Sequence, residues 1–67
     1  MENKLKELRK QKGYTQKQVA AMLGLQCENR LSHWEMGTAV PSVKNLFKLC
    51  KIYVAKIDEI YTKQLDS

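Results

Sequence analysis

The chain has 67 residues, a length that allows one domain with a small core and leaves little room for a large catalytic cleft. Its 12 Lys and Arg residues outnumber 7 Asp and Glu residues, and the net charge of +5 suits a polyanionic partner. The positive charge is concentrated in residues 1–17. This segment has two acidic residues, Glu2 and Glu7, and six basic ones: Lys4, Lys6, Arg9, Lys10, Lys12 and Lys17. Lysines that merely solvate helix faces would give the same charge without a partner.

No segment has the length and hydropathy of a signal peptide or a membrane span, so we expect a cytoplasmic protein with no membrane partner. Cys27 and Cys50 are then expected to be reduced, and neither they nor the one histidine have the spacing of a metal site. We expect no cofactor and no enzyme activity, because no nucleophile–base pair, paired carboxylates or small-molecule substrate site is evident.

The predicted fold class is all-α, a compact bundle of five short helices. The first helix is expected over residues 3–12, with Leu5 and Leu8 inward and Gly13 after its end. The second covers about 16–22 and begins after Thr15, a residue type that caps helices well. Its apolar residues follow helical spacing, at Val19, Met22 and Leu23.

Gly24 then allows a tight turn, because glycine adopts the left-handed conformation without steric cost. A third helix is predicted over about 27–36, with Leu31 and Trp34 inward and Gly37 after its end. Its outward face carries side chains that can hydrogen-bond a base edge: Gln26, Asn29, Arg30 and His33. A helix, a glycine turn and a second helix with a polar face form the arrangement that places a recognition helix in the major groove.

Pro41 and Ser42 begin the predicted fourth helix, with Ser42 as its cap and an apolar stripe formed by Val43, Leu46, Phe47 and Cys50. The last helix is expected over about 56–63, with Ile57, Ile60 and Tyr61 inward. Asp58 and Glu59 lie in its first turn, where the helix dipole favours negative charge. We expect residues 1–67 to form one domain with a helix-turn-helix core at about 16–36.

Two motifs combine in this order along the chain. Residues 8–24 follow the pattern LRxxxGxTQxxxAxxLG, and residues 32–42 follow SxWExGxxxPS. On these motifs the chain resembles the lambda-repressor-like family of helix-turn-helix proteins, also called the Cro type or xenobiotic-response-element type. The resemblance covers nearly the whole chain and implies a five-helix bundle that binds DNA operators, mostly as a dimer.

Three departures from the family pattern are visible. The stretch LQCEN, residues 25–29, has one residue more than is common, so a longer turn is expected before the third helix. The fourth helix ends in Lys51-Ile52-Tyr53 where the family usually has a glycine, so Tyr53 is expected to take a left-handed conformation at about 1 kcal/mol. Ala55 replaces a usual capping serine, so the last helix is expected to begin without a good cap.

Candidate base-reading residues are Gln26, Glu28, Asn29, Arg30 and His33. The Asn29 amide can pair bidentately with adenine, and the Arg30 guanidinium with guanine. His33 could donate to guanine or to a phosphate, and Glu28 could accept from cytosine, orient Arg30 or repel wrong sites. Asn29 and His33 could instead simply face solvent, and Arg30 could instead reach a phosphate or pair with Glu28.

Candidate phosphate contacts are Gln16, Lys17, Thr38, Ser42 and Lys44, which surround the starts of two predicted helices. Plain helix capping is the alternative for these positions. The resemblance further implies that Arg9 and Glu35 form a partly buried ion pair between the first and third helices, which would position the reading helix rather than read DNA.

The sequence thus predicts a sequence-specific binder of double-stranded DNA, a transcriptional regulator of repressor type that acts as a homodimer, because two half-sites multiply specificity. The alternative is an antitoxin-type or other protein-interaction module on the same fold. Such a protein is expected to expose an apolar patch or carry an additional tail, and the few residues after the last predicted helix leave no such tail. A membrane-bound first helix is disfavoured, because its apolar stripe is needed for the core.

Overall fold

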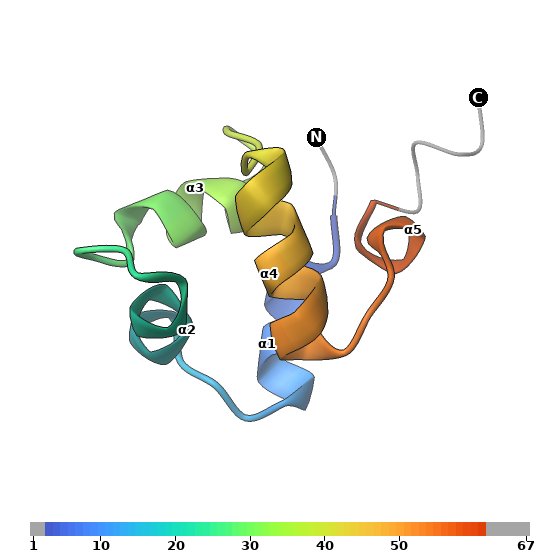
Figure 1. The fold of residues 1–67 in the computed structure, drawn as a ribbon, viewed down its shortest axis with the longest axis horizontal. Coiled ribbons are helices and arrows are strands. Elements are labelled where there is room, and N and C mark those ends of the chain that lie inside the picture. The colour runs from blue at the N-terminus through green and yellow to red at the C-terminus, as the bar shows by residue number, and fades with distance from the viewer. Residues whose placement is uncertain (1–2, 62–67) are drawn as a thin grey trace.

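A computed structural model of the chain describes residues 3–61 and contains five helices and no strand in that range. The helices are α1 (Leu5–Gln11), α2 (Gln16–Leu23), α3 (Asn29–Met36), α4 (Val43–Tyr53) and α5 (Ile57–Ile60). In Figure 1, α4 crosses the centre in front of α1, with α2 and α3 on one side and α5 on the other. The predicted all-α fold class is confirmed.

Two helices begin at side-chain caps that the sequence predicted. The Thr15 hydroxyl accepts from the backbone N–H of Gln18 at 3.1 Å, and the Gln18 amide oxygen accepts from the N–H of Thr15 at 2.8 Å. This reciprocal pair is a capping box, and it fixes the start of α2. The Ser42 hydroxyl accepts from the N–H of Asn45 at 3.2 Å and fixes the start of α4.

Asn3 and Lys4, the two residues before α1, hold this helix against α3 and α5. The Asn3 side-chain oxygen accepts from the N–H of Leu5 at 3.0 Å, so α1 begins two residues later than predicted. The Asn3 amide donates to the carbonyl of Trp34 in α3 at 2.8 Å, and the N–H of Lys4 donates to the carbonyl of Ile60 in α5 at 2.9 Å. These bonds join the residues just before α1 to α3 and to α5.

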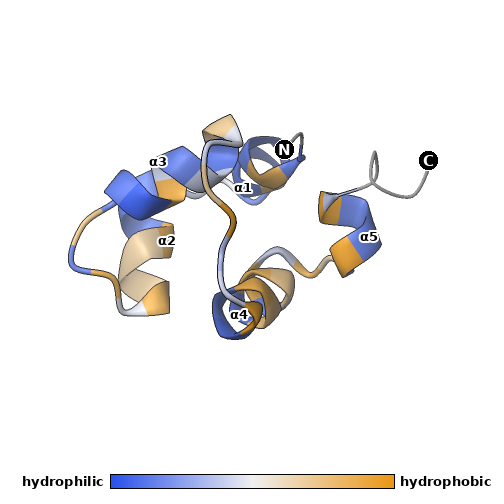
Figure 2. Ribbon diagram, turned by 90° about the horizontal axis from the view of Figure 1, so that it is seen from above, coloured by the Kyte–Doolittle hydropathy of each residue, from blue (hydrophilic) through white to orange (hydrophobic). Residues whose placement is uncertain are grey.

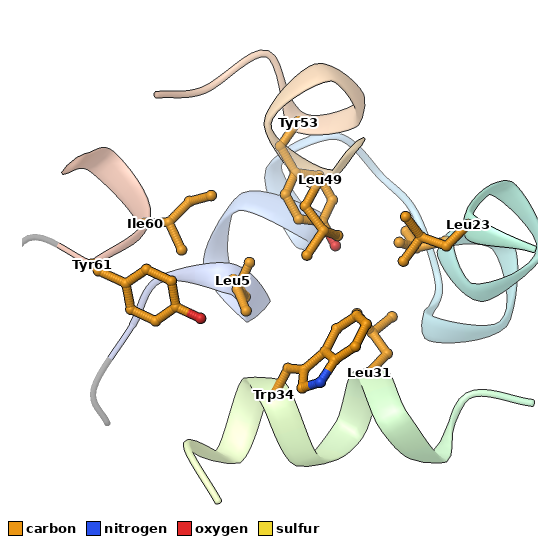
Figure 3. Close-up of a cluster of buried hydrophobic side chains, with 9 residues drawn as sticks. Leu5, Leu23, Leu31, Trp34, Leu49, Tyr53, Ile60 and Tyr61 are labelled. Atoms are coloured by element: carbon orange, nitrogen blue, oxygen red, sulfur yellow. The ribbon is translucent and has the colours of Figure 1, made fainter. Parts of the chain in front are cut away.

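Every helix carries hydrophobic residues (Figure 2), and the buried ones meet in one cluster between the helices (Figure 3). The cluster contains Leu5, Val19, Leu23, Leu31, Trp34, Leu49, Tyr53, Ile60 and Tyr61. Each helix contributes at least one of these side chains. Because helices this short are marginal in isolation, their stability comes from this shared burial.

The predicted apolar stripe of α4 is wrong at two positions. Val43 is 68% exposed and Phe47 is 54% exposed, whereas the buried residues of α4 are Leu49 and Tyr53. The helix is apolar on two sides, because Val43, Phe47 and Cys50 follow one line at spacings of four and three. The prediction mixed this outer line with the inner one, since both follow a helical period.

Two other inward residues were predicted wrongly. Met22 in α2 and Ile57 in α5 are exposed, and Ala20 is buried in α2 instead. The predicted last helix, 56–63, is described here only as Ile57–Ile60, and residues 62–63 lie outside the described range. Within that range Ile60 and Tyr61 are buried, as predicted.

The left-handed residue after α4 is Val54 rather than Tyr53, with φ 52° and ψ 52°. The helix continues one residue beyond the prediction, because Tyr53 is fully packed in the core and keeps helical geometry. A β-branched residue in this region is strained. The capping residue of α5 is Lys56 rather than the predicted Ala55, and it too offers no side-chain acceptor to the helix start. The Glu59 carboxylate accepts from the N–H of Lys56, at 3.3 Å.

Candidate nucleic-acid interface

The turn between α2 and α3 is long. Gly24 ends α2 with φ 77°, and α3 begins at Asn29, two residues after the predicted start. Glu28 precedes α3 without a side-chain hydrogen bond to the helix start. The turn therefore carries Gln26 and Cys27 outside the helix, and the sequence offered no capping residue that would have marked this boundary.

The two faces of α3 differ completely. Leu31 and Trp34 are buried in the core, whereas Asn29, Arg30 and His33 are exposed. Spacings of three and four residues place these three polar side chains on neighbouring positions of the outer surface. The helix thus presents an amide, a guanidinium and an imidazole together, as the sequence predicted.

Among the residues of the turn, Gln26 is exposed and Glu28 is half-buried. Gln26, Cys27 and Arg30 line a hollow of about 310 Å³, so the structure brings Gln26 and Arg30 together. No ion pair joins Arg30 to Glu28 among the contacts described for residues 3–61. The suggested orientation of Arg30 by Glu28 is therefore not seen in this conformation.

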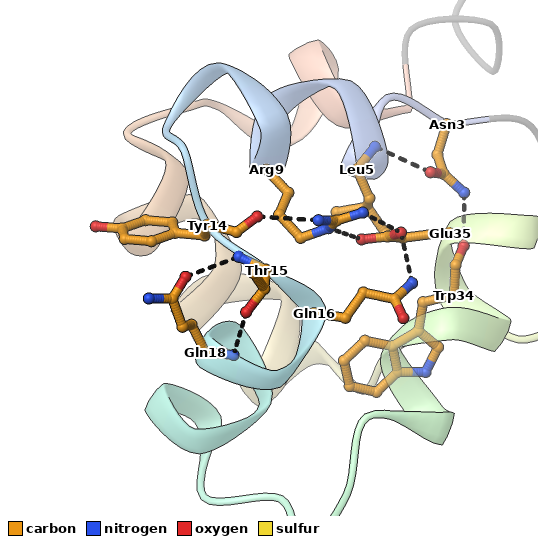
Figure 4. Close-up of polar contacts among 9 residues, drawn as sticks. All are labelled: Asn3, Leu5, Arg9, Tyr14, Thr15, Gln16, Gln18, Trp34 and Glu35. Atoms are coloured by element: carbon orange, nitrogen blue, oxygen red, sulfur yellow. Dashed lines mark hydrogen bonds and ion pairs between the residues drawn. The ribbon is translucent and has the colours of Figure 1, made fainter.

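Arg9 and Glu35 form an ion pair between α1 and α3 (Figure 4). Arg9 Nε donates to Glu35 Oε2 at 2.7 Å and Nη2 donates to Oε1 at 3.3 Å, while Nη1 donates to the carbonyl of Tyr14 at 2.9 Å. The two side chains are only 10% and 3% exposed. The hydrogen bond to Glu35 raises the pKa of Arg9 above its usual value.

Gln16 extends this pair to α2. Its Nε2 donates to Glu35 Oε1 at 2.9 Å, so one carboxylate holds side chains from α1 and α2 at the end of α3 (Figure 4). The sequence prediction assigned Gln16 to a phosphate and missed this bond. An amide nitrogen carries two hydrogens, so a second donor of Gln16 is left for another acceptor.

The other candidate phosphate contacts lie at three places. Lys17 is exposed at the start of α2, where the first backbone N–H groups have no partner within the helix. Ser42 and Lys44 are exposed at the start of α4. Thr38, in the connection between α3 and α4, is already bonded to His33, with Thr38 Oγ1 3.1 Å from His33 Nδ1.

Three other groups have raised pKa values but lie away from the exposed face of α3. Burial raises the pKa of Tyr53, with a further contribution from nearby Glu35, and burial also raises the pKa of Tyr61. Both hydroxyls are buried without a hydrogen-bond partner among the described residues. Burial, followed by the negative charge of Glu59, raises the pKa of the Cys50 thiol, which makes it a poor nucleophile.

A second surface feature is an apolar groove of about 600 Å³ between α4 and α5. Phe47, Cys50, Ile57 and Tyr61 are among the residues that line it. The described residues hold no group of three His, Cys, Asp or Glu that could bind a metal ion. No helix in residues 3–61 is both long and apolar enough to span a membrane.

Comparison with known proteins agrees with this geometry. The sequence profile described as "Helix-turn-helix" matches residues 5–60, which includes all five helices. An uncharacterized HTH-type transcriptional regulator, YgzD of Bacillus subtilis (strain 168), is 33% identical over 61 residues, and the match covers 91% of each chain. No solved structure gives a significant match.

Proposed function

Because this chain belongs to the lambda-repressor-like helix-turn-helix family of DNA-binding transcriptional regulators, we propose that it binds a double-stranded operator with α3 in the major groove. One observation carries this proposal: α3 buries Leu31 and Trp34 and exposes Asn29, Arg30 and His33 on its other face. A helix anchored on one side and rich in hydrogen-bonding groups on the other suits base readout.

Base recognition is assigned to the exposed residues of α3 and the preceding turn. Asn29, in the first turn of α3, pairs with adenine, and Arg30 forks onto guanine N7 and O6. Gln26 lines the same hollow as Arg30 and reads the adjacent base. Glu28 accepts from a cytosine amino group or repels unsuitable sites.

Phosphate contacts position the helix. Gln16 and Lys17 bind one phosphate through the start of α2, and Ser42 and Lys44 bind another through the start of α4. Thr38, which lies between these two groups along the chain, is the remaining candidate phosphate contact. The Gln16 amide enters this contact already oriented by Glu35, so less side-chain entropy is lost on binding.

We assign the Arg9–Glu35 pair a positioning role. Glu35 lies in the last turn of α3, and its carboxylate is bonded to α1 through Arg9 and to α2 through Gln16. The direction of α3 relative to the phosphate contacts of α2 is therefore fixed before DNA binds. We also take residues 1–67 as one domain, with its helix-turn-helix core at 16–36.

The groove between α4 and α5 is assigned to a second copy of the chain. Phe47 and Ile57 are large, exposed and apolar, which is unfavourable unless another surface covers them. The molecule is 35 Å long, and α5 lies at the opposite end from α2 (Figure 1). A two-fold axis at the α5 end would give the dimer two separate α3 helices, as an operator with two half-sites one DNA turn (about 34–36 Å) apart requires.

A cytoplasmic homodimer on an operator would act as a repressor wherever that operator overlaps a promoter. The same apolar groove would also serve an antitoxin-type module that masks another protein, which is the second candidate function. The polar face of α3 favours DNA, since a masking protein would not need it. No enzymatic function is proposed.

The test is selection of bound fragments from a random DNA pool with the purified chain. We expect a palindromic site with half-sites about 10 base pairs apart. The variant Asn29→Ala/Arg30→Ala should enrich no sequence, and Gln11→Ala, an exposed amide on α1, should enrich the wild-type site. Equal recovery of all sequences by the wild-type chain would contradict the proposal.

A further inference from the structure

The end of α3 fixes the position of Thr38. Gly37 adopts φ 81°, and its N–H donates to the carbonyl of Trp34 at 3.2 Å. The N–H of Thr38 donates to the carbonyl of His33 at 3.1 Å. These two bonds form a Schellman motif, in which the residue after the glycine is bound to the last helical turn. The backbone therefore holds Thr38 against the last turn of α3, where its hydroxyl can reach His33.

From this position the hydroxyl touches His33 twice. Thr38 Oγ1 donates to the His33 carbonyl at 3.2 Å and lies 3.1 Å from His33 Nδ1. A hydroxyl has one hydrogen, so once it donates to the carbonyl it can only accept from Nδ1. The negative end of the helix dipole at this last turn also favours an N–H group over a lone pair at Nδ1.

We propose that Thr38 fixes the neutral His33 ring as its Nδ1–H tautomer, so that Nε2 presents a lone pair outward. In the major groove such an atom accepts a hydrogen bond, and the donors there are the amino groups of adenine N6 and cytosine N4. His33 therefore reads an amino-bearing base rather than guanine, and Thr38 is a specificity-determining residue that need not touch DNA. The base readout rests on the proposed function, whereas the tautomer of His33 does not.

The tautomer can be measured on the free protein, because His33 is the one histidine of the chain. Long-range ¹H–¹⁵N NMR at a pH where the ring is neutral should show a pyrrole-type Nδ1 and a pyridine-type Nε2. Thr38→Val removes the hydroxyl at nearly constant shape and should shift the ring toward Nε2–H, and Thr38→Ser should keep the wild-type pattern. A pyridine-type Nδ1 in the wild-type chain, or identical spectra for wild type and Thr38→Val, would overturn the proposal.

DNA selection then tests the consequence. The position read by His33 is the one whose preference disappears in His33→Ala. There we expect about a tenfold preference for an amino-bearing base (about 1.4 kcal/mol), falling toward equality in Thr38→Val and retained in Thr38→Ser. Preference for guanine at that position would overturn the readout. If no DNA is selected, the proposed function fails, while the NMR result still decides the tautomer.

Discussion

The carboxylate of Glu35 binds the guanidinium of Arg9 through two hydrogen bonds, at 2.7 and 3.3 Å, with both side chains almost fully buried. A third bond, from Gln16 Nε2, reaches the same carboxylate at 2.9 Å. One acidic residue at the end of α3 thus connects it to α1 and α2. In a domain with so small a core, this polar junction determines how the proposed recognition helix sits on the rest of the fold.

Replacing Arg9 should therefore lower the stability of the fold more than it changes the preference for the operator. Arg9→Ala leaves the Glu35 carboxylate buried with only Gln16 as its donor, and we expect a loss of about 2 kcal/mol or more in the free energy of unfolding. For a domain of this size that lowers the melting temperature by about 10 °C, measurable by circular dichroism. Lys10→Ala, an exposed cation on the same helix, is the control. An unchanged melting temperature with lost affinity would make Arg9 a DNA contact instead.

Much of the fold could be predicted from the sequence, because its signals are local. Thr15 and Ser42 mark helix starts, and Gly24 and Gly37 mark ends, since each side chain or its absence acts on the adjacent backbone. The inward positions of Leu31 and Trp34 followed from one clear period. The start of α3 did not follow, because no capping residue marks it.

The predictions failed where the local sequence does not determine which residues are buried or which side chains meet. In α4 two apolar lines share the helix, and only packing determines that Leu49 faces inward while Phe47 does not. The bonds from Gln16 to Glu35 and from Thr38 to His33 depend on how helices and turns meet in space, so residue spacing could not reveal them. The exposed polar face of α3 was predictable, since it is the complement of the buried one.

Val54→Gly should stabilise the protein. Val54 has φ 52°, a region that costs a β-branched residue about 1 kcal/mol or more and costs glycine little. We expect the midpoint of urea unfolding to rise, with a gain of about 1 kcal/mol reduced by the extra entropy of glycine in the unfolded chain. Val40→Gly, at an exposed valine without positive φ, should be neutral or destabilising. A loss of stability in Val54→Gly would mean that the Val54 side chain packs against something.

Phe47→Glu should abolish self-association. The substitution places a charge in the apolar groove between α4 and α5, whereas the monomer loses little because Phe47 is exposed. Sedimentation equilibrium should give a dimer for wild type and a monomer for the variant. Met36→Glu changes another exposed apolar residue outside the groove and should remain dimeric. A dimer that survives Phe47→Glu would place the interface elsewhere, and a monomeric wild type would leave the groove to another protein.

Lys17→Ala should weaken binding to every duplex by a similar factor. A phosphate contact releases condensed counterions, so losing one should flatten the slope of log affinity against log salt by about one unit. Lys51→Ala removes the same charge from the last turn of α4, at the opposite end from Ser42 and Lys44, and should change the slope less. Binding measured by fluorescence anisotropy at several salt concentrations provides both slopes. Equal slopes for Lys17→Ala and wild type would remove Lys17 from the set of phosphate contacts.

Asn29→Ala should selectively reduce operator binding. Asn29 is exposed in the first turn of α3, and loss of a bidentate contact to adenine costs about 1–3 kcal/mol on the true site. Random duplex should lose much less, because non-specific binding depends on phosphates. The variant should also tolerate substitution of one base pair in each half-site, while its melting temperature stays close to wild type.

The long turn before α3 supplies the competing assignment, since Gln26 lies beside Arg30 and could take the central reading role. Measuring Asn29→Ala and Gln26→Ala on operator and random DNA at one salt concentration separates the two. A selective operator loss in Asn29→Ala supports the assignment made here, because only a base contact distinguishes the two DNAs. A selective loss confined to Gln26→Ala would move base recognition into the turn. Equal losses on both DNAs for Asn29→Ala would show that its amide binds the backbone and reads no base.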